Sequence, residues 1–67
     1  MKVETMFYIA LGTAVPSVAK SEAYANYAST EDNKSTRNFY NRKALKYRTM
    51  AIVEFDREMD RLVKEYK

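Results

Sequence analysis

Apolar side chains recur every seven residues along the C-terminal part of the chain. The repeat consists of six residues: Leu45, Ile52, Phe55, Met59, Leu62 and Tyr66. This spacing places apolar side chains along one stripe of an α-helix, and such a stripe packs against a partner. The repeat therefore predicts a long helix, and we expect these six residues to form the seam through which two copies of the chain associate.

The composition removes most other means of stabilising so short a chain. It has 67 residues, no Cys and no His. A domain of this size buries about 60% of the surface of its unfolded chain, and it commonly needs disulfides, a metal or a partner. Disulfides are impossible here, and the common zinc, haem and iron–sulfur ligands are absent. We therefore predict one cofactor-free domain, stabilised by association, in a reducing compartment such as the cytoplasm.

The uncharged segment 6–19 raises the question of targeting. Its last three residues, Ser-Val-Ala, resemble a signal-peptidase site. However, an acid precedes the segment, and Gly12 and Pro16 interrupt its apolar run. A membrane-spanning helix needs about 20 apolar residues. The sequence therefore favours neither a signal peptide nor a membrane span.

The N-terminal region favours helix over strand. Its apolar residues follow helical spacing at Val3, Phe7, Ala10 and Ala14. The aromatic and β-branched residues of segment 3–11 also suit a strand, but they do not alternate with polar residues. Gly12 and Pro16 are expected to end or kink the first helix, and a second helical stretch is expected from residue 16 to about residue 28.

A polar segment, residues 29–35, separates this region from the long helix predicted over residues 36–66. That helix would be roughly 45 Å long. The predicted fold is all-α: a short N-terminal helix, or kinked helices, packed on the long C-terminal helix in a dimeric bundle. The apolar band at residues 50–53 surrounds the helix, so we expect it to be buried where the helices and the subunits meet.

Cations and aromatic rings are interleaved between residues 34 and 48. From this block we predict a partner-binding face formed by Arg37, Tyr40, Arg42, Lys43, Lys46, Tyr47 and Arg48. An acidic protein partner, or self-pairing, is the favoured interpretation. Single-stranded nucleic acid is the alternative, because phosphates attract cations and bases stack on aromatic rings. A solvated surface, or a pocket for a small phosphorylated ligand at Tyr40 and Tyr47, is a further interpretation.

The charges of the long helix divide into two halves. Residues 37–48 carry five cations and no acid, whereas residues 54–65 carry five acids and three cations. Two antiparallel copies would place the basic half of one beside the acidic half of the other. A parallel pair would instead bring the two Arg48 residues together. Charge complementarity therefore predicts an antiparallel homodimer.

No residue pattern indicates catalysis. The acids of residues 54–60 are expected to pair with cations three or four residues away, namely Glu54 with Arg57, Glu58 with Arg61, and Asp60 with Lys64. Such pairing explains these acids without a metal site. The usual His and Cys catalysts are absent, and a single glycine cannot form a phosphate-binding loop. We therefore predict that the chain is not an enzyme.

These observations favour a small helical protein–protein interaction module. We expect it to act as a regulator or inhibitor of another protein, in the style of small phage or mobile-element proteins. The alternatives are a nucleic-acid-binding module that uses the basic and aromatic block 34–48, and a structural subunit of a larger assembly.

Overall fold

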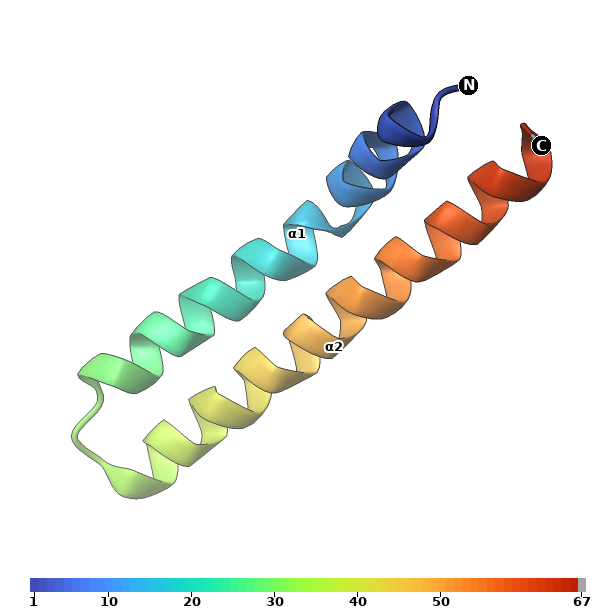
Figure 1. Cartoon of the computed structure of the whole chain (residues 1–67). Coiled ribbons are helices and arrows are strands. Elements are labelled where there is room, and N and C mark those ends of the chain that lie inside the picture. The colour runs from blue at the N-terminus through green and yellow to red at the C-terminus, as the bar shows by residue number, and fades with distance from the viewer. Residues whose placement is uncertain (67) are drawn as a thin grey trace.

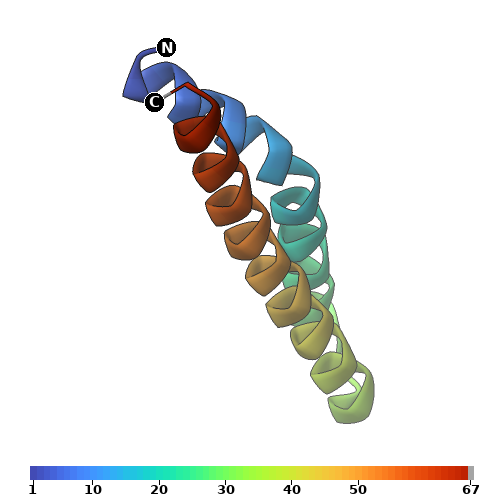
Figure 2. The ribbon, with the colours of Figure 1, turned by 90° about the vertical axis from the view of Figure 1, so that its right-hand side faces the viewer.

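The computed structural model describes residues 1–66, which form two long helices packed side by side (Figure 1). Helix α1 spans Val3–Thr30 and helix α2 spans Lys34–Glu65. The helices are antiparallel and form a hairpin with extents of 50 × 14 × 11 Å. Figure 2 shows the same pairing at right angles, with both termini at the end opposite the connection. The predicted all-α fold is confirmed.

Helix α1 is one continuous element. The sequence predicts that Gly12 and Pro16 end or kink a first helix; the first alternative is wrong, because a single helix includes both residues. Pro16 has no N–H to donate to the carbonyl four residues earlier. Residues on both sides of it, Ala14 and Ser17, are buried. Packing against α2 therefore maintains the helix where the local sequence opposes it.

The connection between the helices comprises only residues 31–33, fewer than the polar segment 29–35. The Asn33 side chain caps α2 by accepting a hydrogen bond from the Thr36 N–H at 3.0 Å. The Glu31 carboxylate in turn accepts one from the Asn33 N–H at 3.1 Å. The polar residues of this segment thus satisfy two backbone donors at the start of α2, those of Asn33 and Thr36.

Small side chains dominate the interface between the two helices. Seven of the nine buried residues are Ala or Ser: Ala10, Ala14, Ser17, Ser21 and Ala28 in α1, and Ala44 and Ala51 in α2; the other two are Met6 and Leu62. Several of these recur at intervals of seven, as expected for antiparallel helices that stay in contact along their length. Because Ala and Ser are short, the interface buries little apolar surface per residue.

Two serine hydroxyls connect the helices within this interface. The Ser21 hydroxyl donates a hydrogen bond to the Ala44 carbonyl oxygen at 2.9 Å. The Ser17 hydroxyl donates one to a carboxylate oxygen of Glu54 at 2.5 Å. Hydrogen bonds of this kind satisfy polar groups that would otherwise be costly to bury. They also fix how far one helix is displaced along the other.

The termini end of the hairpin is closed by larger apolar residues. The rings of Phe7 and Phe55 pack edge to face with centroids 5.2 Å apart. Met6 and Leu62 are buried at the same end of the hairpin, at 5% and 2% exposure. Larger apolar contacts therefore supplement the small-residue interface near the chain ends.

Within the single hairpin, residues 50–53 are not buried on all sides, and their expected contact with a second subunit stays a prediction. Only Ala51 is buried, whereas Met50, Ile52 and Val53 are exposed. The reason is that α2 packs against a single helix, which covers only the side of α2 that carries Ala51. The large apolar side chains of this band remain on the surface.

Replacing Gly12 with Ala should stabilise the hairpin. A Cβ at this position would meet no atom within 4 Å, and the residue has no positive φ. Because glycine inside a helix costs about 0.5–1 kcal/mol relative to alanine, G12A should raise the free energy of unfolding by about that amount in urea titrations. The reverse substitution at exposed Ala19, A19G, should lower it similarly. A loss of stability in G12A would contradict this account.

Candidate interaction surfaces

Aromatic rings and lysines gather on one side of the hairpin, near the connection. We call this group the tyrosine–lysine face; its members are Lys20, Tyr24, Tyr27, Phe39, Tyr40, Lys43, Lys46 and Tyr47. The first three come from α1 and the others from α2. The antiparallel fold brings the two sets together because both lie close to the turn in sequence.

Tyr24 is the central ring of this face. It stacks on Tyr47 with centroids 5.7 Å apart and an angle of 1° between the ring planes. It also lies 6.2 Å from Tyr27 and 6.1 Å from Tyr40. Tyr27 and Tyr40 are themselves 5.5 Å apart. These separations are typical of interacting aromatic pairs, so the four rings form one packed cluster.

Three lysines lie next to aromatic rings. The Nζ atoms of Lys20 and Lys46 are 5.3 and 5.7 Å from the centroid of Tyr47. The Nζ atom of Lys43 is 5.6 Å from the centroid of Phe39. These distances allow cation–π attraction. The ammonium groups are therefore held beside the rings while they retain their charge and their hydrogen-bond donors.

The tyrosine hydroxyls of this face are available to a partner. Tyr24, Tyr40 and Tyr47 are half-buried, and Tyr27 is exposed. Over residues 1–66 none of these hydroxyls takes part in a hydrogen bond, and no half-buried side chain hides an unsatisfied polar atom. Each half-buried tyrosine thus packs its ring against its neighbours and presents its hydroxyl to solvent.

The structure brings together some of the residues predicted to bind a partner. Tyr40, Lys43, Lys46 and Tyr47 belong to the tyrosine–lysine face. Lys20, Tyr24 and Tyr27 of α1 also belong to it, although sequence reasoning did not include them in the predicted face.

The three predicted arginines lie elsewhere. Arg37 and Arg42 are exposed on α2. Arg42 is two residues from buried Ala44, and residues two apart on a helix project roughly 200° apart, so Arg42 points away from α1. Arg48 lines a groove on the other side of the hairpin. The basic block is therefore divided among different sides of α2.

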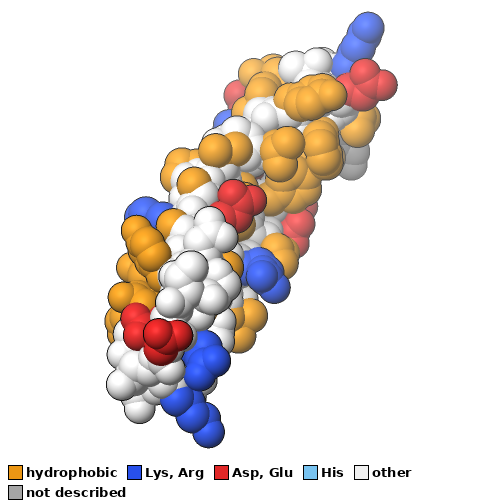
Figure 3. Space-filling model, turned by 90° about the vertical axis from the view of Figure 1, so that its left-hand side faces the viewer, with side chains coloured by type: hydrophobic (Ala, Val, Ile, Leu, Met, Phe, Trp, Pro, Cys, Tyr) orange, Lys and Arg blue, Asp and Glu red, His pale blue; other side chains and the backbone are white. Residues whose placement is uncertain are grey.

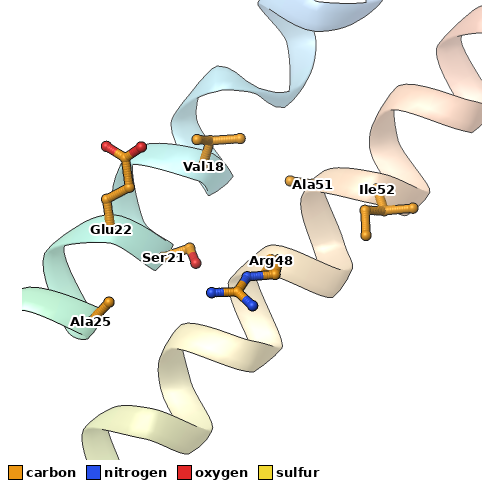
Figure 4. A pocket seen from close by; sticks show the side chains of 7 residues that line it. All are labelled: Val18, Ser21, Glu22, Ala25, Arg48, Ala51 and Ile52. Carbon is orange, nitrogen blue, oxygen red and sulfur yellow. The ribbon is translucent and has the colours of Figure 1, made fainter. Parts of the chain in front are cut away.

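That groove is apolar and lies between the two helices. We call it the apolar groove and define it by Leu11, Ala14, Val18, Ala51, Ile52 and Phe55. Toward the connection it continues into a pocket of about 310 Å³, where Ser21, Glu22, Ala25 and Arg48 join the lining (Figure 4). Val18 and Lys20, like Leu45 and Lys43, are two residues apart and project to opposite sides of their helices. The groove and the tyrosine–lysine face therefore lie on opposite sides of the hairpin.

The residues predicted to form a self-association seam differ in their exposure. Leu45 and Ile52 are 60% and 58% exposed, Tyr66 is exposed, and Phe55 and Met59 are half-buried. Leu62 is only 2% exposed. It belongs to the hairpin's own interface and cannot contact a second copy in this conformation. Figure 3 shows that, on the side of the molecule it faces, hydrophobic side chains gather mainly toward the end that holds the termini.

The acidic end of α2 contains one of the three predicted ion pairs. Arg61 contacts Glu58 at 2.5 Å and Glu65 at 2.6 Å. The hydrogen bond from Arg61 lowers the pKa of Glu58, and the same bond raises the pKa of Arg61. Arg61 and Glu65 are exposed and Glu58 is half-buried, and ion pairs at such a surface contribute little to stability. This network offsets part of the negative charge at that end of the helix.

The other two predicted pairs, Glu54 with Arg57 and Asp60 with Lys64, are not among the ion pairs within residues 1–66. Glu54 instead accepts the hydrogen bond from Ser17, because it faces α1. Asp60 and Lys64 are exposed, and exposed partners gain little by pairing.

No protein-family model, curated protein or solved structure matches this chain. We therefore infer function from the surfaces themselves. Within residues 1–66 no helix has an apolar stretch long enough to cross a membrane. No group of three acidic side chains in that range is arranged to hold a metal ion.

Tyr24 should contribute more to stability than its partial exposure suggests, because its ring contacts three others. Y24A should lower the free energy of unfolding by about 2 kcal/mol, less than for a fully buried aromatic residue. Y24F should stay within about 0.5 kcal/mol of the wild type, because the hydroxyl has no partner in the chain. Urea denaturation of the three proteins tests this, and equal losses in Y24A and Y24F would contradict it.

Proposed function

We propose that this chain is a protein-interaction module that regulates or inhibits another protein by binding it through the tyrosine–lysine face. The observation that supports this proposal is the packed cluster of rings with lysines beside it. Tyrosine is enriched at binding hot spots, because it offers a large contact area at low entropic cost. Rings that are already packed lose little further freedom on binding.

The charge of this region favours an acidic partner. Residues 20–53 contain seven Lys and Arg but only three Asp and Glu. Of these acids, Glu22 lines the apolar groove on the opposite side, and Glu31 and Asp32 lie in the connection. None of the ion pairs among residues 1–66 includes a lysine of the tyrosine–lysine face. Complementary charge on a partner would increase both its association rate and its specificity.

The packing of the rings favours a protein surface over a small ligand. Tyr24 lies flat against Tyr47 and also contacts Tyr40. The space in which a small phosphorylated ligand would stack between Tyr40 and Tyr47 is thus occupied by a side chain of α1. What remains accessible is a set of ring edges, hydroxyls and ammonium groups, which suits a broad contact.

Single-stranded nucleic acid is the alternative, and one observation favours it. The outer rings, Tyr27 and Phe39, are 55% and 47% exposed, so a base could stack on either one. Binding of this kind would depend steeply on salt, because it releases counterions from the phosphates. A structural subunit, the third candidate, would form assemblies larger than a dimer.

Replacing the three lysines of the tyrosine–lysine face should weaken partner binding. In pull-downs from source-cell extract at moderate salt, K20Q/K43Q/K46Q should capture about one tenth or less of the partner protein that the wild type captures. The matched control, K2Q/R57Q/K64Q, removes the same charge from the termini half and should bind as the wild type does.

Equal losses in the two variants would mean that net charge alone drives binding, which would contradict the proposal. Fluorescence anisotropy with a labelled oligo-dT tests the alternative. Tight, salt-sensitive binding that K20Q/K43Q/K46Q abolishes, without a captured protein, would replace the proposed function with nucleic-acid binding.

A further inference from the structure

We infer that the apolar groove is covered by a second copy of this chain, packed antiparallel about a two-fold axis at Ile52. This inference concerns the side of the hairpin opposite the tyrosine–lysine face, and it does not depend on the proposed function. It rests on three observations: the small apolar area buried in the hairpin's own interface, the register of residues around Ile52, and the unpaired charge of Arg48.

The hairpin buries mainly small residues and leaves large ones in water. Its interface is built from Ala and Ser, with Met6 and Leu62 near the termini. On the groove side, Leu45 and Ile52 are more than half exposed. A chain of this size commonly needs a further source of burial. Covering the side chains on the groove side of α2 would provide most of this additional buried apolar area.

The sequence around Ile52 is suited to an antiparallel two-fold axis. Across such an axis, a residue that precedes Ile52 in one copy lies opposite the residue that follows Ile52 by the same number of positions in the other copy. Leu45, seven before, would lie opposite Met59, seven after. Both are apolar and both lie on the stripe of α2 that contains Ile52. Apolar residues would therefore meet apolar residues across the axis.

The same axis would pair opposite charges. Arg48 is four residues before Ile52, and Asp56 is four residues after it. Antiparallel packing would thus bring Arg48 of each copy level with Asp56 of the other. A parallel arrangement would bring Arg48 against Arg48. Charge complementarity of this kind determines orientation more than affinity.

Within residues 1–66, Arg48 takes part in no ion pair. It lines the groove, yet none of the ion pairs or side-chain hydrogen bonds of residues 1–66 includes it. Glu22 lines the same pocket, but its carboxylate points away from the guanidinium (Figure 4). A guanidinium held at the rim of an apolar groove is thus available to a carboxylate from another molecule.

A dimer of this kind would leave both tyrosine–lysine faces free. Each face lies on the side of its hairpin away from the groove and near the connection, and antiparallel packing places the two connections at opposite ends. The dimer would then present two equal faces, directed away from each other. Such an arrangement suits a partner that is itself multivalent, because the second contact forms at high effective concentration.

The test uses the full chain in sedimentation-equilibrium experiments over a range of concentrations. We expect a dimer, and a melting temperature that rises with protein concentration, because association stabilises the folded chain. I52D should weaken dimerisation by about a hundredfold or more, because it would bury two uncompensated carboxylates at the axis. M50D is the matched control and should dimerise like the wild type, because Met50 is exposed and, two positions from Ile52, projects to the opposite side of α2.

The orientation is tested by exchanging the charges. R48E and D56R should each weaken dimerisation by about tenfold, and the combined variant R48E/D56R should recover to within about threefold of the wild type. Recovery requires that each residue faces the other across the dimer, which a parallel arrangement does not provide.

A monomeric wild type whose melting temperature is independent of concentration would overturn the inference. So would a dimer that I52D leaves intact. Failure of R48E/D56R to recover would overturn the antiparallel register. K20Q/K43Q/K46Q should leave the molar mass unchanged, so the failure of partner binding and the failure of dimerisation can be told apart.

Discussion

The close contact of two helices through alanine and serine is the feature on which the rest of this structure depends. Ala44 and Ala51 of α2 face Ala and Ser residues of α1, and Ser17 and Ser21 donate hydrogen bonds across the interface. Short side chains let the helix backbones approach, but they remove little apolar area from water. The hairpin is therefore held by a long, narrow contact instead of a broad core.

Both interaction surfaces are consequences of this narrow contact. Since the interface holds mainly small side chains, most of the large ones project from the two sides of the hairpin. On one side they are tyrosines, which pack against one another and keep their hydroxyls in water. On the other side they are aliphatic residues, such as Val18 and Ile52, which line a groove. The rings of the first surface cover one another, whereas Val18 and Ile52 of the second remain exposed, and this exposure is the basis for proposing a second copy there.

The sequence predicted the long C-terminal helix, but it did not predict which residues of that helix pack against the rest of the chain. The repeat through Leu45 and Ile52 indicated a long helix, and that helix exists. The neighbouring positions Ala44 and Ala51, which face α1, are also seven apart, but alanines are a weak signal beside leucine and isoleucine. A heptad pattern shows that a helix has a partner along its length. It does not say whether the partner belongs to the same chain.

The candidate site could have been predicted more fully by treating the polar segment as a tight turn. Tyr24 and Tyr40 are each eight residues from Asp32, so folding the chain there brings them together. The continuity of α1 through Pro16 could not have been predicted in this way. Local rules oppose it, and only packing on both sides of the proline maintains the helix.

The antiparallel hairpin also determines which contacts lose the least chain entropy when they form, and therefore the order in which they can form most easily. Tyr27 and Tyr40 are joined by a short chain segment that includes the turn, whereas Phe7 and Phe55 come from near opposite ends of the sequence. The entropy lost in closing a loop grows with its length, so contacts next to the turn are the cheapest to close first. Folding that advances from the turn toward the termini would assemble the tyrosine–lysine face before the far end of the molecule. A partly frayed chain would then retain the tyrosine–lysine face longest, and its chain ends would be the first to open.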